Sequence, residues 1–212
     1  MTRHSVGTYG RLFPQLHIPI ILLLILRAGK NIRKQTATDH EDWLTTRLYR
    51  KLIHEPSFRD GPLQIHLQPE IVSSGVDPET NTPEGRLDLQ VSCGLGYEVY
   101  FAIEAKRLRV SLPSRLFLGG LEYVKDGMMR FITGQYAPFM QAGAMLGYVY
   151  DGKTEDARAD ICRQIQKMAK ELKIREPKRL VPSAIVPNQP IDETNHGLDR
   201  RPFTIFHFFL NV

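Results

Sequence analysis

Two acidic residues and a lysine lie inside an apolar part of the chain, where charged side chains are unusual. The stretch GRLDLQVSCGLGYEVYFAIEAKRLRV, residues 85–110, contains Asp88, Glu104 and Lys106. Two carboxylates brought close together repel, and each raises the pKa of the other unless a cation lies between them. A divalent cation such as Mg²⁺ prefers oxygen ligands of this kind. A lysine beside that cation could orient a water molecule or stabilise the charge of a phosphate.

The alternation of apolar and polar residues predicts two strands joined by a turn at CGLG. Every second side chain of a strand lies on the same face. Asp88 is therefore expected on the polar face of one strand, and Glu104 and Lys106 on the polar face of the other. A natural hairpin register would bring the three together. The alternative is a solvated face on which Asp88 and Lys106 form an ordinary cross-strand ion pair, since D…ExK is a loose pattern.

Two further polar residues align with apolar stripes on predicted helices. Glu41 belongs to a helix expected to begin at Thr38, where TDHE also fits a capping box. Gln135 follows Phe131 by four residues in a helical region expected over 113–142. A polar side chain on a buried stripe needs a partner inside the protein, so both residues could join the hairpin cluster. The capping box for Glu41 and backbone hydrogen bonding for Gln135 are the alternatives.

The remaining patterns predict the elements that would position these residues. The expected order is one helix, three strands, helices, a strand, an amphipathic helix and a last strand. A turn-rich loop is expected over 73–85, and His196 is expected in a loop and His207 in the core. This order indicates an α/β sandwich, with one mixed sheet and helices on both faces. The predicted strands span 63–72, 87–91, 97–110, 144–150 and 203–210, and the amphipathic helix spans 154–173.

The composition is that of an ordinary globular protein. The 212 residues predict one domain at 38–212 preceded by an apolar and basic helical element at 1–37. A net charge of +5 permits a polyanionic partner without requiring one. Cys93 and Cys162 are too few for a disulfide framework or a cysteine zinc site, so a reducing, cytoplasmic location is expected. The chain has no GxxxxGK[ST], GxGxxG or HExxH motif.

The run IPIILLLIL at 18–26 is the most apolar part of the chain. It is about half the ~20 residues that a helix needs to cross a bilayer. No A-x-A-like cleavage site follows it, and the next segment is basic. We therefore expect a buried helix that could take part in a subunit contact. A signal peptide and a membrane attachment are the alternatives.

Basic residues border the acidic cluster along the sequence. The predicted contacts to nucleic acid are Lys34, Arg107, Arg109 and Arg130. Such a rim would bind phosphates in a salt-dependent way without reading bases. A solvated surface is the alternative for each single residue. The nearby Tyr136 could stack on a base, but core packing is the expected role.

Asp88 in GRLDLQV, Glu104 and Lys106 in FAIEAKRLR, and Glu41 on the preceding helix resemble the motifs of the PD-(D/E)XK, or restriction-endonuclease-like, nuclease superfamily. The resemblance covers about 38–150 and implies an αβββαβ core. Leu87 stands where many members have a proline. The resemblance implies that Asp88 and Glu104 bind Mg²⁺, or Mn²⁺ in its place, with the Ala105 carbonyl as an extra ligand.

The same resemblance implies that Lys106 positions the attacking water, that Glu41 holds a second metal or a water, and that Gln135 is an auxiliary residue. The expected activity is metal-dependent hydrolysis of nucleic acid, with DNA favoured over RNA. The chain would act as a homo-oligomer or as the nuclease subunit of an antiviral defence, repair or mobile-element assembly. The alternative is a catalytically silent nucleic-acid-binding or assembly subunit. No membrane partner is expected.

Overall fold

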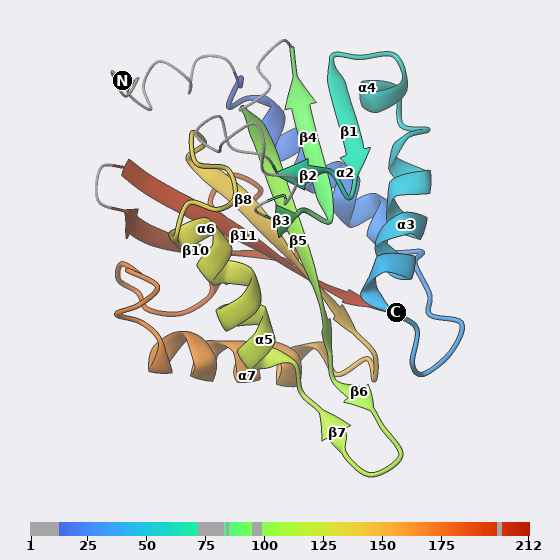
Figure 1. The fold of residues 1–212 in the computed structure, drawn as a ribbon, viewed down its shortest axis with the longest axis vertical. Helices are drawn as coiled ribbons and strands as arrows, with labels where there is room; N and C mark the ends of the chain where they lie inside the picture. Colours follow the sequence, from blue (N-terminus) through green and yellow to red (C-terminus); the bar gives the residue numbers. More distant parts are fainter. Residues whose placement is uncertain (1–12, 72–82, 84, 95–98, 199–200) are drawn as a thin grey trace.

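A seven-stranded mixed sheet forms the centre of the protein (Figure 1). The structure is a computed structural model and describes residues 13–71, 83, 85–94, 99–198 and 201–212. The order across the sheet is β1-β4-β5-β8-β11-β10-β9. The strand bounds are β1 Leu63–Leu67, β4 Leu89–Cys93, β5 Tyr100–Leu108, β8 Ala142–Val149, β9 Val181–Pro182, β10 Ile191–Leu198 and β11 Arg201–Asn211. The predicted α/β architecture with one mixed sheet is confirmed.

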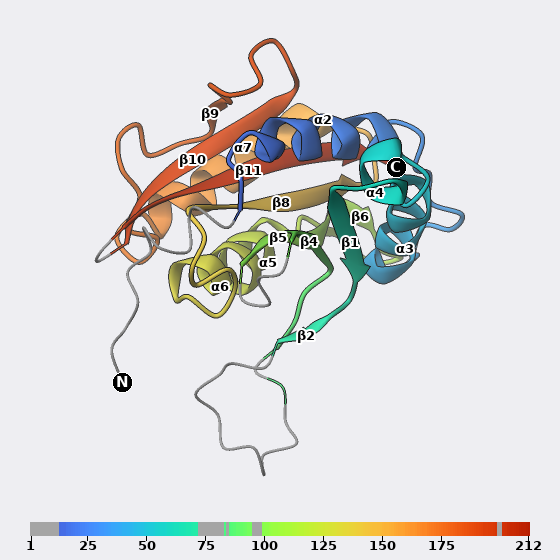
Figure 2. The same cartoon turned by 90° about the horizontal axis from the view of Figure 1, so that it is seen from above.

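Helices cover both faces of this sheet. One continuous helical stretch, made of α5, the π-helix η1 and α6, lies on one face together with α7, which packs against α5 and η1. Figure 2 shows α2 on the opposite face, and α3 lies at the β1 side of the sheet. The helix bounds are α2 His17–Gly29, α3 Glu41–Leu52, α4 Pro56–Arg59, α5 Gly120–Glu122, η1 Tyr123–Met128, α6 Met129–Ile132 and α7 Thr154–Lys167.

The predicted hairpin is present at the centre of the sheet. β4 and β5 are antiparallel, with Leu89 opposite Ile103 and Val91 opposite Phe101. β1 pairs with β4 in antiparallel fashion, whereas β8 is parallel to β5 and to β11. Residues 95–98, at the predicted turn and the start of the next predicted strand, lie outside the described residues, as do 72–82 and 84, which include most of the predicted turn-rich loop. Short ribbons β2 Glu70–Ile71 with β3 Gly85–Arg86, and β6 Val110–Ser111 with β7 Leu116–Phe117, flank the sheet.

The apolar run at 18–26 forms most of α2 and is buried, as predicted. Ile21, Leu22 and Ile25 have no exposed surface and belong to the same hydrophobic core as the sheet, while Ile20 and Leu23 are each 42% exposed. Within the described part of the chain, no helix combines the length and apolar character needed to cross a membrane. The division at residue 37 stays a prediction.

The helical region predicted over 113–142 is much shorter in the structure. Its first residues form the β6–β7 ribbon, and the helix begins only at Gly120. It ends at Ile132, because Gly134 adopts a left-handed backbone (φ +81°) that closes a helix and cannot continue it. Gln135 therefore lies in a turn, and the prediction that it occupies a helix face is wrong.

The segment Ile191–Leu198, in which His196 was predicted to be a loop residue, is strand β10. Its polar sequence hides the strand, because the buried polar groups are satisfied by partners distant in sequence. Asp192 receives two hydrogen bonds of 2.7 Å from Arg158 of α7.

The two buried histidines of the last hairpin belong to one hydrogen-bond chain. Thr194 Oγ1 lies 2.8 Å from His196 Nε2 and 2.9 Å from His207 Nε2, and Tyr123 Oη lies 2.9 Å from His207 Nδ1. His196 Nδ1 contacts the Leu172 carbonyl at 2.8 Å, so this nitrogen carries the proton. Burial lowers the pKa of His196 to about 4 and that of His207 well below its usual range. His207 is a satisfied core residue as predicted, whereas His196 is not in a loop.

Candidate active site

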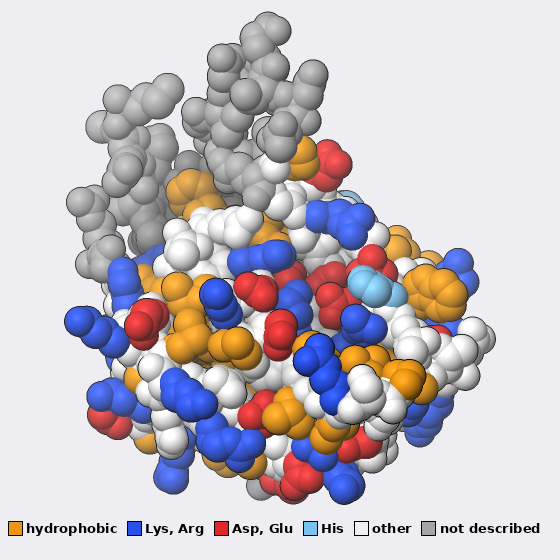
Figure 3. All heavy atoms as spheres, turned by 60° about the horizontal axis from the view of Figure 1, so that its bottom comes forward, with side chains coloured by type: hydrophobic (Ala, Val, Ile, Leu, Met, Phe, Trp, Pro, Cys, Tyr) orange, Lys and Arg blue, Asp and Glu red, His pale blue; other side chains and the backbone are white. Residues whose placement is uncertain are grey.

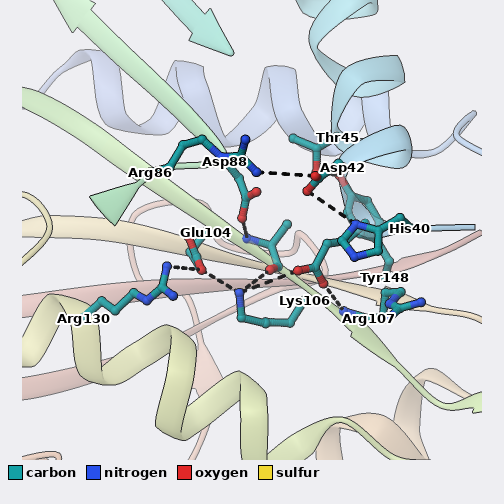
Figure 4. A network of polar contacts seen from close by, with 12 residues as sticks. His40, Asp42, Thr45, Arg86, Asp88, Glu104, Lys106, Arg107, Arg130 and Tyr148 are labelled. Carbon is teal, nitrogen blue, oxygen red and sulfur yellow. Dashed lines mark hydrogen bonds and ion pairs between the residues drawn. The ribbon is translucent and has the colours of Figure 1, made fainter. Parts of the chain in front are cut away.

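Asp88, Glu104 and Lys106 meet at the start of the β4–β5 hairpin (Figure 4). Extending the hairpin register by one residue from the Leu89–Ile103 pair puts Asp88 opposite Glu104. The Ala105 amide donates a 2.6 Å hydrogen bond to Asp88 Oδ2. Lys106 Nζ donates to Glu104 Oε1 at 2.6 Å and to the Ala105 carbonyl at 2.9 Å. The convergence expected from strand alternation is present.

Glu41 joins this cluster from the first residue of α3. Its Oε2 accepts a 3.1 Å hydrogen bond from the Arg107 amide of β5, and its Oε1 lies 3.9 Å from Lys106 Nζ. The predicted capping box is wrong, because the N-cap residue is His40 and makes no side-chain cap bond. Asp39 closes the preceding turn by accepting hydrogen bonds from the Gln35 and Thr36 amides. Glu41 is thus free of a capping role and reaches β5.

Arg130 of α6 supplies a second cation, which was predicted only as part of a basic rim. Its Nη1 donates to Glu104 Oε1 at 3.1 Å and to the Tyr136 hydroxyl. That hydroxyl in turn donates to the Arg86 carbonyl at 2.8 Å. The Tyr136 ring is buried, as predicted, but its hydroxyl fixes Arg130. Sequence spacing could not indicate this, because the turn after α6 determines where Tyr136 points.

The other predicted residues occupy different positions. Gln135 lies beside Gly85 of β3. A Cβ added to Gly85 would lie only 2.8 Å from the Gln135 Nε2 atom. Lys34 donates to the carbonyls of Tyr150 and Val212, at the ends of β8 and β11. Lys34 therefore helps to hold the chain together at that end of the sheet.

Arg107 lies on β5 and Arg109 just beyond its end, and the two differ in their surroundings. Arg109 is buried and forms ion pairs with Asp151 at 2.9 Å and Asp156 at 3.3 Å. These ion pairs indicate a structural role for Arg109. Arg107 contributes its backbone amide to Glu41, and its side chain is partly exposed. Arg86 adds another exposed guanidinium nearby, 3.5 Å from Asp42.

Burial controls the protonation of the carboxyl groups. It raises the pKa of Glu104 to about 8, with the Asp88 charge as the next cause, so Glu104 is largely protonated at neutral pH. Burial also raises the pKa of Asp88 and that of Glu41. Burial alone would lower the pKa of Lys106, but Glu104 and Glu41 outweigh it and raise this pKa. A cation bound between these carboxyl groups would lower their pKa values and release their protons.

The donor set fits a hard divalent cation. Asp88, Glu104 and the Ala105 carbonyl offer oxygen ligands, the type that Mg²⁺ prefers. Glu104 Oε2 is buried and has no hydrogen-bond partner among the described residues, which is costly for a polar atom in either protonation state. No group of three or more His, Cys, Asp and Glu side chains is preformed as a metal site in the described part of the chain. The ammonium of Lys106, which contacts Glu104 and the Ala105 carbonyl, occupies part of that coordination space.

The raised pKa of Glu104 predicts a pH-dependent stability difference between the metal-free wild type and Glu104→Gln. Below pH 4.5 Glu104 is protonated in both the folded and the unfolded state. Between 4.5 and about 8 the folded state keeps a proton that the unfolded state has released, so the contribution of Glu104 to stability is lost progressively over this interval and is fully lost above about pH 8. Urea unfolding in EDTA at a series of pH values should show the wild type losing free energy of unfolding relative to Glu104→Gln. A pH-independent difference would contradict the assignment.

Comparisons of the chain with protein-family models, with curated proteins and with solved structures each find no match. The fold and site define an α/β protein in which the mixed sheet, α3 and α6 together bring three carboxyl groups and two cations to the central hairpin. Function is therefore inferred from the chain's own residues.

Proposed function

We propose that the protein is a Mg²⁺-dependent nuclease of the restriction-endonuclease-like class, acting on DNA in preference to RNA. The observation that carries the proposal is the meeting of Asp88, Glu104 and Lys106, with one buried Glu104 oxygen that lacks a partner among the described residues. Two buried carboxylates beside a cation are expensive to maintain for stability alone. A metal site explains that cost.

The arrangement of elements supports the same proposal. Along the chain α3 is followed by β1, β4 and β5, then by the α5–α6 stretch and β8. This is the αβββαβ order that the resemblance implies, with Asp88 immediately before its second strand and Glu104 on its third. β8 lies parallel to β5, so the helical stretch crosses one face of the sheet and delivers Arg130 to Glu104.

Each residue of the cluster then has a chemical role. Asp88, Glu104 and the Ala105 carbonyl would hold the cation, which would polarise a phosphate oxygen and lower the pKa of a water molecule. Lys106 would leave Glu104, orient the attacking water and stabilise the negative charge that develops on the phosphate. Glu41 would keep Lys106 directed into the site. The hydrogen bond that Glu41 accepts from the Arg107 amide fixes the position of its carboxylate.

Arg130 would stabilise the same phosphate charge from the other side of Glu104. We expect Arg130→Ala to lower the cleavage rate by about a hundredfold, the usual scale for one lost donor to a transition state. Added guanidinium should restore part of this loss, because it can refill the vacated position. Tyr136→Phe, which removes one hydrogen bond to Arg130, should have a smaller effect. Full activity of Arg130→Ala would remove Arg130 from the mechanism.

The proposal is tested by incubating the protein with labelled duplex DNA, single-stranded DNA and RNA, with Mg²⁺, Mn²⁺ or EDTA. We expect cleavage with either metal and none with EDTA. Cleavage that persists in EDTA, or no cleavage of any of the three substrates by a metal-binding protein, would contradict a Mg²⁺-dependent nuclease. The polarity of cleavage products would also separate endonuclease from exonuclease action.

One observation favours the alternative of a silent nucleic-acid-binding or assembly subunit. Lys106 and Arg130 both contact Glu104 Oε1, so the cluster is already paired with two protein cations. A subunit that kept the fold without catalysis would bind no Mn²⁺ at this site. Isothermal titration with Mn²⁺ distinguishes the two functions. Assembly as a homo-oligomer or within a defence, repair or mobile-element complex, and a cytoplasmic location, stay predictions.

A further inference from the structure

A second charged feature lies away from the acidic cluster, at the carboxyl end of α7. A surface cavity of about 570 Å³ opens there among four lysines. The side chains that line it come from the last turn of α7 and the chain that follows. They are Gln166, Lys167, Ala169, Lys170, Lys173, Ile174 and Lys178. No acidic residue is among these lining residues, so the cavity presents positive charge.

Most of the protein's net charge is concentrated in this segment. Residues 167–179, KMAKELKIREPKR, contain six Lys and Arg against two Glu, a net charge of +4, while the whole chain carries +5. Lys178 pairs with Glu176 at 3.3 Å, but Lys167 and Lys170 have no ion-pair or hydrogen-bond partner among the described residues. Like charges held together repel, so a polyanion would stabilise the Lys167 and Lys170 ammonium groups in this cluster.

The segment belongs to the helical layer that also carries Arg130. α7 packs beside α5 and η1, which continue directly into α6. In Figure 3, which brings the α7 side of Figure 1 forward, Lys and Arg side chains are prominent on the lower left of this face. A long polyanion bound to this layer could contact the lysines and the site at once. A mononucleotide could not.

The chemistry of the lining favours nucleic acid over a lipid surface. A membrane-bound helix places apolar side chains beside its lysines for insertion among the lipids. Here the apolar lining residues are Ala169, which is only partly exposed, and Ile174, which is 7% exposed. The cavity offers charge without an insertable apolar face, which suits a phosphate backbone.

We infer that the lysine cavity at the end of α7 is a second nucleic-acid contact, which binds the backbone of the substrate away from the cleaved bond. The identity of the polyanion rests on the proposed function. The contact reads no bases, so it raises affinity for long substrates without adding sequence preference. Its ligand is the polyphosphate backbone of a strand or duplex that extends beyond the acidic cluster.

The test is binding of a fluorescein-labelled DNA duplex to the full chain in EDTA, where no cleavage occurs, over a series of KCl concentrations. Lys167→Glu/Lys170→Glu removes two cations from the cavity. Each lost phosphate contact lowers the slope of log K against log salt by about 0.9 for duplex DNA. The slope should therefore fall by about 2 relative to the wild type. The control Lys30→Glu/Lys51→Glu makes the same charge change at exposed positions near the ends of α2 and α3 and should leave the slope close to that of the wild type.

Two results would overturn the inference. One is an equal fall in slope for both double variants, which would mean that only net charge matters. The other is binding to phosphatidylserine vesicles but not to DNA. Failure of the proposed function is seen separately, because it is measured by metal-dependent cleavage. A wild type that binds DNA through these lysines and cleaves nothing would leave the contact established and the nuclease proposal rejected.

Discussion

Glu104→Gln is expected to lose metal-dependent cleavage by at least about a hundredfold while the protein still folds. Loss of a residue that only supports a metal ligand already costs about 10- to 100-fold in metal affinity or activity, so loss of a ligand should cost more. The substitution is nearly isosteric. With its pKa at about 8, Glu104 is largely neutral in the metal-free protein at pH 7, and glutamine reproduces that neutral form. Circular dichroism at pH 7 should therefore resemble that of the wild type. The free energy of unfolding of Glu104→Gln at pH 7 should be the higher of the two, because the unfolded wild type, but not the unfolded variant, is favoured by ionisation at this pH.

The matched control for this variant is Glu155→Gln on α7. Glu155 is 82% exposed and pairs only with Arg158 of its own helix among the described contacts, so the change removes one carboxylate charge without touching the cluster. We expect this control to cleave like the wild type. Normal cleavage by Glu104→Gln would show that Glu104 is not a metal ligand. Loss of cleavage in both variants would point to net charge instead of the site.

Lys106→Met is expected to separate metal binding from catalysis. Its ammonium contacts Glu104 Oε1 at 2.6 Å and the Ala105 carbonyl at 2.9 Å, which are the oxygens a cation would use. A unit charge and a divalent ion 4 Å apart repel by about 2 kcal/mol even at the dielectric constant of water. Removing the ammonium should therefore tighten Mn²⁺ binding by about tenfold, since 1.4 kcal/mol corresponds to that factor.

Cleavage by the same variant should fall by about a hundredfold to a thousandfold, because Lys106 would no longer orient water or stabilise the phosphate. Titration calorimetry with Mn²⁺ and single-turnover cleavage measure the two effects. Lys125→Met, at an exposed position of η1, is the control and should change neither. Weaker Mn²⁺ binding by Lys106→Met would mean that the lysine supports the ligands instead of competing with the metal.

Local sequence patterns were sufficient for the β4–β5 hairpin and for the convergence of Asp88, Glu104 and Lys106. Side chains alternate strictly in a strand, and two strands joined by a short connection pair in few registers. The burial of the 18–26 run followed in the same way, because nine nearly continuous apolar residues must be covered. The apolar strand β11 was also found where expected, for the same reason of strand burial.

The failures have a common physical origin in contacts between distant parts of the chain. β10 looks like a loop because its polar residues are satisfied by Arg158, Leu172 and His207, which no local pattern reveals. Similarly, the predicted long helix overlooked Gly134, whose left-handed backbone ends it and turns Tyr136 back toward Arg130.

The sequence by itself therefore determined the α/β class, the central hairpin and the three charged residues on its polar face, because these depend on the period of side chains along a strand. Only the tertiary structure decided that Glu41 reaches β5 instead of capping its helix, that Arg130 contacts Glu104, and that Arg109 pairs with Asp151. Those contacts depend on how α3, α6 and the strand ends are placed in space. The spacing of these residues along the chain does not determine that placement.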